Sequence, residues 1–168
     1  EHTDHVQGAR VTSKRTGLPV WYSKRTFYKC YDKNKAPYSS FFENGASYKI
    51  GQFTIYPFSK NHDAAEPSSF RIEVKGKHIG VMTDIGIRDK ILIEEFSKCD
   101  AVFLESNYDP EMLSTGPYPY YLQQRVSSSK GHLSNEEAVE LIENYASNNL
   151  KTVFLSHISA VNNSKEIV

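Results

Sequence analysis

The chain has 168 residues with 20 basic and 20 acidic side chains, which gives a formal net charge of zero at pH 7. This length accommodates one domain with a substantial core and is too short for two such domains. There is no overall basic excess, so a polyanionic partner would have to be bound locally or through metal ions. No run of about 18 apolar residues is present, which excludes a membrane-spanning helix. We therefore expect a single domain over residues 1–168.

Two cysteines, Cys30 and Cys99, lie far apart and lack the spacing of a metal-binding or redox pair. They predict reduced, semi-buried thiols in a cytoplasmic protein rather than a disulfide framework. The sequence starts without methionine inside an apparent motif and stops at SKEIV, where a helix is expected to begin. We therefore expect an interior fragment of a longer protein, truncated at both ends.

Strands and helices are expected to alternate along the chain, which indicates an α/β fold. Helical patterns cover 5–15, which ends at Gly17, and then 24–33, 88–98 and 134–148. The last of these begins with a capping box formed by Ser134 and Glu137. Strand patterns cover 19–23, 46–50, 52–59, 69–74, 78–85, 100–106 and 152–159. The stretch 109–126 is rich in proline and tyrosine and carries no assignment.

Four of the predicted strands end in a residue that can bind a metal ion: His62, Asp84, Glu105 and His157. Because the ends of several strands in one sheet converge, we expect these side chains to face a common cleft. The first five residues add His2, Asp4 and His5. A lone histidine is more often structural than a ligand, but this combination favours metal binding. Imidazole and carboxylate donors without thiolates suit Zn, Mn or Fe.

Several segments resemble the metallo-β-lactamase-fold hydrolases. EHTDHVQG resembles their HxHxDH signature entered one residue late, and LSHIS resembles their last ligand motif. NHDAAEPSSFRIEVKGKHIGVMTDIG is similar to the segment that carries a ligand histidine and the bridging aspartate. More narrowly, ESNYDPEML, GPYPYYLQQRV and GHLSNEEA resemble the bacterial YycJ/WalJ/VicX group. The resemblance implies an αββα sandwich that lacks its N-terminal strands, with a dinuclear site at one edge where the two sheets meet.

The resemblance also implies a ligand set for two divalent ions. The first ion would be held by His2, His62 and a histidine directly before Glu1. The second would be held by Asp4, His5 and His157, with Asp84 bridging both. Two such ions can hold a bridging hydroxide and stabilise the charge on a phosphoryl group. Asp4 would also orient that hydroxide or take its proton.

His132 and Glu105 resemble a pair that serves phosphodiester cleavage in the tRNA 3′-end-processing relatives. His132 would contact a phosphate oxygen or protonate the leaving oxygen, and Glu105 would orient it. Simpler interpretations stay open for both residues. His132 could bond the cap of the helix that follows it, and Glu105 could be satisfied by backbone N–H groups.

Three functions compete. The first is a metal-dependent phosphodiesterase acting on nucleic acid, DNA more than RNA; the resemblance implies a 5′→3′ DNA exonuclease. The second is a dinuclear hydrolase of a small ester, thioester or lactam. The third is a non-catalytic interaction domain of the same fold, for which lost ligands would be the expected mark.

Two surface features also have two interpretations each. Basic residues cluster early in the chain: Lys14, Arg15, Lys24, Arg25 and Lys29. A solvated helix face explains them better than a nucleic-acid interface does. Tyr118, Tyr120 and Tyr121 either stack on bases or pack on the core as an aromatic lid.

Overall fold

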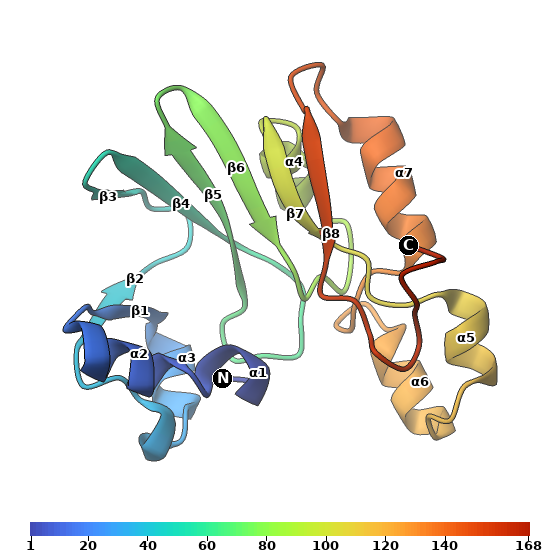
Figure 1. The fold of residues 1–168 in the computed structure, drawn as a ribbon, viewed down its shortest axis with the longest axis horizontal. Helices are drawn as coiled ribbons and strands as arrows, with labels where there is room; N and C mark the ends of the chain where they lie inside the picture. The colour runs from blue at the N-terminus through green and yellow to red at the C-terminus, as the bar shows by residue number, and fades with distance from the viewer.

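The computed structural model describes residues 1–168 and is built around one six-stranded sheet in the order β3-β4-β5-β6-β7-β8 (Figure 1). The strands are β3 (Tyr48–Ile50), β4 (Phe53–Ser59), β5 (Ser68–Val74), β6 (Lys77–Met82), β7 (Ala101–Glu105) and β8 (Thr152–Ser156). Strands β3 to β6 pair antiparallel, whereas β6, β7 and β8 are parallel. The predicted hairpin between β5 and β6 is present, with Lys75 and Gly76 at positive φ in its turn.

Two helices cover one face of this sheet, because parallel neighbours need crossover connections. Helix α4 (Lys90–Phe96) joins β6 to β7, and α7 (Asn135–Tyr145) leads into β8. Their buried side chains meet those of β4, β6 and β7 in the main core, which includes Phe58, Met82, Leu92, Phe96, Val102, Leu104, Ala138 and Leu141. The predicted capping box of α7 is formed as expected.

The other face of the sheet is also apolar. Phe103 of β7 and Phe154 of β8 pair across the strands and stack with ring centroids 4.7 Å apart. Both remain partly accessible to solvent, with 42% and 49% of their surface exposed. The sequence predicted a buried strand over 100–106, but β7 is buried on the face that packs on the helices and leaves Phe103 accessible on the other. The six-stranded sheet thus has one face covered by helices and an opposite face that also carries apolar side chains.

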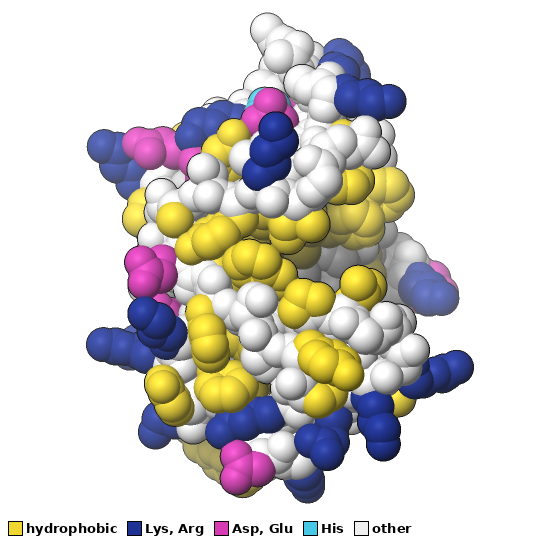
Figure 2. Space-filling model, turned by 90° about the vertical axis from the view of Figure 1, so that its left-hand side faces the viewer, with side chains coloured by type: hydrophobic (Ala, Val, Ile, Leu, Met, Phe, Trp, Pro, Cys, Tyr) yellow, Lys and Arg dark blue, Asp and Glu magenta, His cyan; other side chains and the backbone are white.

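The N-terminal lobe is a smaller unit at one end of the sheet (Figure 1). It contains α1 (Thr3–Val6), α2 (Ala9–Thr16), β1 (Val20–Ser23), α3 (Lys24–Lys29), the 3₁₀ turn η1 (Asp32–Asn34) and β2 (Ser39–Phe42). Strands β1 and β2 form a separate parallel pair. Lys and Arg side chains fringe the lower part of the molecule, where this lobe lies (Figure 2).

Two predicted helices of the lobe are shorter than expected. The helix over 5–15 is split into α1 and α2, and a turn at Gln7 and Gly8 separates them. The helix over 24–33 stops at Lys29, because Cys30 takes an extended conformation and is buried in the lobe's core. Strand β2 was not predicted, since its sequence SSFF lacks a clear alternation of apolar and polar residues.

The unassigned proline- and tyrosine-rich stretch forms two helices, α5 (Pro110–Thr115) and α6 (Tyr120–Val126). Proline is compatible with both because it stands at or before the first turn, where its missing N–H is not needed. The Asp109 side chain caps α5 by accepting from the N–H of Met112 at 2.8 Å. Tyr118 packs with both helices against a third small core of Tyr108, Leu113 and Val126.

Three remaining expectations concern the cysteines, the C-terminal segment and the membrane. Cys30 and Cys99 are both buried free thiols. Residues 165–167 form a turn and not the start of a helix. None of the helices combines the length and apolar character needed to cross a membrane.

Candidate active site

All the predicted donor residues converge at one edge of the sheet, between the strand ends and helix α1. His2 is the N-cap of α1, and Asp4 and His5 lie within it. His62, Asp84 and His157 follow β4, β6 and β8, and Glu105 is the last residue of β7. The strand ends therefore meet as the sequence predicted, and the N-terminal helix brings the HTDH run against them.

The first group of donors contains His2, His62, Asp63 and Asp84. Asp63 Oδ1 lies 3.4 Å from His62 Nε2 and 3.7 Å from His2 Nε2. Asp84 Oδ1 lies 3.5 Å from His62 Nε2. His62 Nε2 and Asp63 Oδ1 are both buried without a hydrogen-bond partner. Sequence reasoning missed Asp63, although it directly follows His62; the histidine expected before Glu1 stays a prediction.

The second group contains Asp4, His5, His157 and again Asp84. His5 Nε2 lies 3.4 Å from Asp4 Oδ2 and 3.1 Å from Asp84 Oδ2. His157 Nε2 lies 3.6 Å from Asp4 Oδ2 and 3.6 Å from Asp84 Oδ1. Asp84 therefore stands between the two groups, where a bridging ligand would be required.

The spacing of these atoms fits divalent cations. Donors about 2.1 Å from a tetrahedral ion lie about 3.4 Å from one another, and the separations given above run from 3.1 to 3.7 Å. Buried polar atoms almost always have a partner, and a shared cation would supply one to His62 Nε2 and Asp63 Oδ1. The donor chemistry suits Zn, Mn or Fe.

Glu105 orients two histidine rings at once. This carboxylate is fully buried, and its Oε1 accepts from His132 Nδ1 at 2.9 Å and from His157 Nδ1 at 2.6 Å. With both Nδ1 atoms donating to Glu105, each Nε2 is left available for a metal ion or a substrate. Glu105 also accepts three backbone N–H bonds, from Asp84, Ile85 and Leu133. Glu105 is therefore bonded both to the ring of His132 and to backbone N–H groups, as the two interpretations of the sequence separately described.

His132 does not cap the helix that follows it. Ser134 caps α7, and the backbone N–H of His132 donates to the carbonyl of Val126 at 2.9 Å. The ring centroid of His132 lies 5.1 Å from that of His62 and 5.3 Å from that of His157. His132 therefore borders both donor groups, and it forms a cluster with Asp84, Glu105 and His157 in which one ligand atom of each residue lies within 4.8 Å of the others.

Backbone geometry fixes three of the other donors. His62 Nδ1 lies 2.9 Å from the carbonyl oxygen of Gly131, an arrangement that leaves Nε2 free for a cation. Gly131 itself lies against the backbone carbonyls of Arg125 and Val126. A Cβ at this position would collide with both carbonyls, so the position requires glycine. Asp84 and His157 have left-handed φ values of 52° and 55°. Such positions cost about 1–3 kcal/mol each and occur where the surroundings hold a functional group in place.

Lys60 is a second residue that sequence reasoning missed. Its Nζ donates to the carbonyl of Thr83 at 2.5 Å and lies 3.7 Å from Asp84 Oδ2, and its side chain is nearly buried. Burial lowers the pKa of Lys60, while the nearby carboxylates oppose this shift. A lysine two residues before a predicted ligand carries no recognisable motif, so the burial that brings it to Asp84 could not be read from the sequence.

The local charges favour ionised acids and raise the pKa of His5 and His157, whereas burial lowers the pKa of His62. Burial opposes ionisation of Asp84, but the hydrogen bond from His5 and the charges of Lys60 and His157 hold its pKa far below the usual range. The Asp84 hydrogen bond raises the pKa of His5. The Glu105 hydrogen bond is the main cause that raises the pKa of His157 to about 9, although burial opposes it.

Metal binding is therefore expected to release protons from the site. With a pKa of about 9 the His157 ring is protonated at pH 7, and its Nε2 must lose that proton to bind a cation. The raised pKa stabilises the metal-free fold fully below pH 6.5, and this stability is lost as the pH rises through about 9. Zinc affinity should rise over the same interval.

Calorimetric zinc titrations at pH 7 in two buffers of different ionisation enthalpy will measure this release. Equal apparent enthalpies in both buffers would show that no proton leaves on binding. The thermal stability of the metal-free protein should fall between pH 6.5 and 9, which gives an independent readout of the same group.

A cavity of about 300 Å³ opens beside the donors, between the lobe and the sheet. His2, His5, His62 and Asp84 line one side of it, and apolar side chains from both β-sheets line the other. The same cavity is therefore lined by the His and Asp donors and by apolar side chains.

The six-stranded mixed sheet thus carries a His/Asp cluster at one edge. The chain matches the family described as Beta-lactamase superfamily domain over residues 1–158. It therefore belongs to the β-lactamase superfamily.

Similar proteins support the same family. The chain is 31% identical over 172 residues to the exodeoxyribonuclease WalJ of Streptococcus pneumoniae serotype 2 strain D39. It is 29% identical over 170 residues to the exodeoxyribonuclease YycJ of Bacillus anthracis. Both alignments cover 99% of this chain but 64% of the relative, so the chain spans just under two thirds of their length.

Solved structures confirm the fold class expected from the sequence. The metallo-β-lactamase fold protein YhfI from Bacillus subtilis superimposes with a TM-score of 0.66 at 19% identity, covering 95% of this chain and 62% of that one. Zn²⁺-bound PqqB from Methylobacterium extorquens gives a TM-score of 0.69 at 14% identity, covering 93% and 59%.

Proposed function

We propose that this chain carries the metal-binding core of a metal-dependent phosphodiesterase that cleaves nucleic acid, DNA more than RNA. The observation that supports this most is the His132–Glu105 pair. In the proposed ligand set His132 holds no metal ion, and its Nδ1 is hydrogen-bonded to Glu105 Oε1 at 2.9 Å. The similar proteins named exodeoxyribonucleases support the same substrate class, and 5′→3′ polarity is part of the proposal.

The proposed roles follow from the atoms that each side chain presents. Two divalent ions held by the donor groups would supply Lewis acidity and activate the attacking water. Asp4, the most exposed donor, would orient that water and accept its proton. His132 would donate from Nε2 to a phosphate oxygen or to the leaving oxygen, and Glu105 would keep its ring in place.

A dinuclear hydrolase of small esters, thioesters or lactams is the second candidate. Its reaction would need the two donor groups but not His132. The non-catalytic alternative receives no support from the donor residues, since those predicted within this chain converge. The His132–Glu105 pair is therefore the feature that favours nucleic acid.

A substrate comparison tests the proposal. We expect the full-length natural protein, loaded with Mn²⁺ or Zn²⁺, to shorten end-labelled single- or double-stranded DNA, and RNA more slowly. A lactam and a thioester are assayed beside the nucleic acids. Turnover of either small substrate without cleavage of any nucleic acid would reject the proposed function in favour of the second candidate.

A further inference from the structure

Arg125 of helix α6 connects this helix to the donor cluster. Its Nε and Nη2 both lie 2.6 Å from Asp63 Oδ2. The other oxygen of Asp63 is the one that lies 3.4 Å from His62 Nε2. The Arg125 side chain is nevertheless 59% exposed. A guanidinium has five N–H donors in a fixed fork, so Arg125 keeps free donors beside the metal centre.

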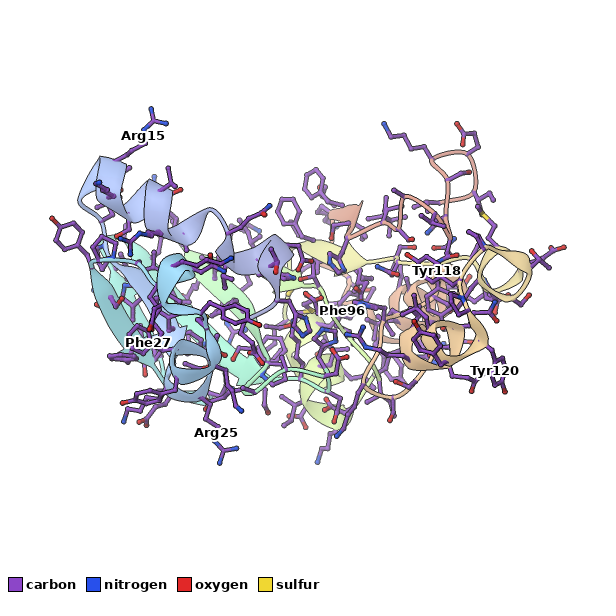
Figure 3. The ribbon with its side chains drawn as sticks, turned by 90° about the horizontal axis from the view of Figure 1, so that it is seen from below. Arg15, Arg25, Phe27, Phe96, Tyr118 and Tyr120 are labelled. Atoms are coloured by element: carbon purple, nitrogen blue, oxygen red, sulfur yellow. The ribbon has the colours of Figure 1, made fainter.

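The three tyrosines around the start of α6 have different environments. Tyr118 packs on the small core of Tyr108, Leu113 and Val126, so the lid interpretation holds for Tyr118 alone. Tyr120 and Tyr121 are 75% and 73% exposed. Figure 3 shows Tyr120 at the outer edge of the helix, away from the core. These two rings therefore offer apolar surface that no other part of the described chain covers.

Helix geometry places Tyr121 and Arg125 on one face. Residues four apart in an α-helix are surface neighbours, separated by about 6 Å along the axis. One face of α6 thus combines an exposed aromatic ring with a cation anchored at the metal centre. An aromatic ring can stack on any of the bases, so this contact does not depend on the nucleic-acid sequence. A guanidinium binds a phosphate through paired N–H bonds.

We propose that α6 binds the end of an unpaired nucleic-acid strand next to the metal centre. Arg125 contacts a backbone phosphate beside the cleaved one, and Tyr121 stacks on an adjacent base, with Tyr120 as the neighbouring aromatic surface. Stacking on Tyr121 requires a base that is not paired, so α6 prefers single-stranded or frayed ends over blunt duplex. This inference rests on the proposed function, and it specifies that the bound part of the substrate is unpaired.

The N-terminal lobe is the competing surface. Residues 8–36 carry eight basic and one acidic side chain. Only Lys24 and Lys35 among them pair with a carboxylate. Arg15 and Arg25 point away from the molecule on opposite sides of the lobe (Figure 3). Because these charges diverge, the lobe fits non-specific attraction of a polyanion better than positioning of one strand.

The test measures binding of single-stranded DNA with phosphorothioate linkages, which resist cleavage, by fluorescence anisotropy. Tyr121→Ala is expected to raise the Kd roughly 5- to 100-fold, the range for losing one stacked base, and Tyr121→Phe should stay near wild type. Arg125→Ala should raise the Kd about 10-fold and reduce the slope of log Kd against log salt concentration by about 1. Blunt duplex of equal length should bind more weakly than the single strand.

Matched controls come from the lobe. Tyr28, which is 76% exposed, and Arg15 are each replaced by alanine, so that one exposed ring and one exposed cation are lost away from α6. Both variants should lose less affinity than Tyr121→Ala and Arg125→Ala, and equal losses in these controls would overturn the inference. Metal content and melting temperature are measured for every variant, because Arg125→Ala also removes the partner of Asp63.

The outcomes separate this inference from the proposed function. Tyr121-dependent binding of single strands by a protein that cleaves no nucleic acid would support the α6 surface and reject the activity. Cleavage of DNA with a Kd that Tyr121→Ala leaves unchanged would reject the α6 surface and keep the activity. If Arg125→Ala loses metal, Arg125 supports Asp63, and the Tyr121 variants alone decide the inference.

Discussion

Replacing Asp84 by alanine is expected to remove metal from both donor groups and to reduce phosphodiester turnover to the metal-free background. Asp84 Oδ1 lies within 3.6 Å of His62 and His157, and Oδ2 lies 3.1 Å from His5. No other donor approaches both groups, so its loss cannot be compensated within the site. The low pKa of Asp84 also means that its negative charge offsets the neighbouring cations.

Elemental analysis of purified wild type and variant will measure the ions per chain. Asp84→Asn is the second variant, because asparagine tolerates the left-handed φ of 52° and preserves the shape of the side chain. Asp32→Ala, which removes an exposed carboxylate of the lobe, should keep the wild-type content. Two ions retained in both Asp84 variants would contradict the bridging assignment.

Replacing His132 by alanine is expected to lower nuclease turnover by roughly 10²–10⁴, the usual effect of losing a positioned acid or base. Metal content should stay at the wild-type level, because the proposed ligand set does not include His132, although its ring lies close to Asp84 and His157. A hydrolase of small esters would be far less sensitive to this change. The same preparation therefore distinguishes the two candidate functions.

The His132 experiment needs turnover and metal content from one sample. His132→Gln serves as the control for packing, because it fills part of the space of the ring without supplying an acid. Its turnover should fall as far as that of the alanine variant. Loss of metal in either variant would show that His132 is a ligand, and unchanged turnover would remove it from the mechanism.

The sequence predicted that the strand-end residues would lie close together, because their pattern is local. Each follows an apolar strand, and strands of one sheet bring their ends together. Asp63 and Lys60 were missed for the opposite reason, since only the path of the loop after β4 turns them toward His62 and Asp84. Proline in the segment 109–126 concealed α5 and α6, although it occupies positions that a helix start permits.

The interpretation of the three tyrosines shows the same limit. Tyr118, Tyr120 and Tyr121 are nearly adjacent in sequence, yet one is packed and two are exposed. The exposure of their side chains differs because Tyr118 precedes α6, whereas Tyr120 and Tyr121 lie in its first turn. A composition-based prediction treats them alike, and only the direction of α6 separates them.

One oxygen atom, Oε1 of Glu105, accepts from the rings of both His132 and His157. The histidine proposed to hold metal and the histidine proposed to contact substrate therefore share a single acceptor, and a shift of either ring would disturb the other. Their contributions to the free energy of the reaction are then coupled, so the effect of changing both differs from the sum of the separate effects. If the proposed roles hold, Glu105 links metal occupancy to substrate positioning in this site.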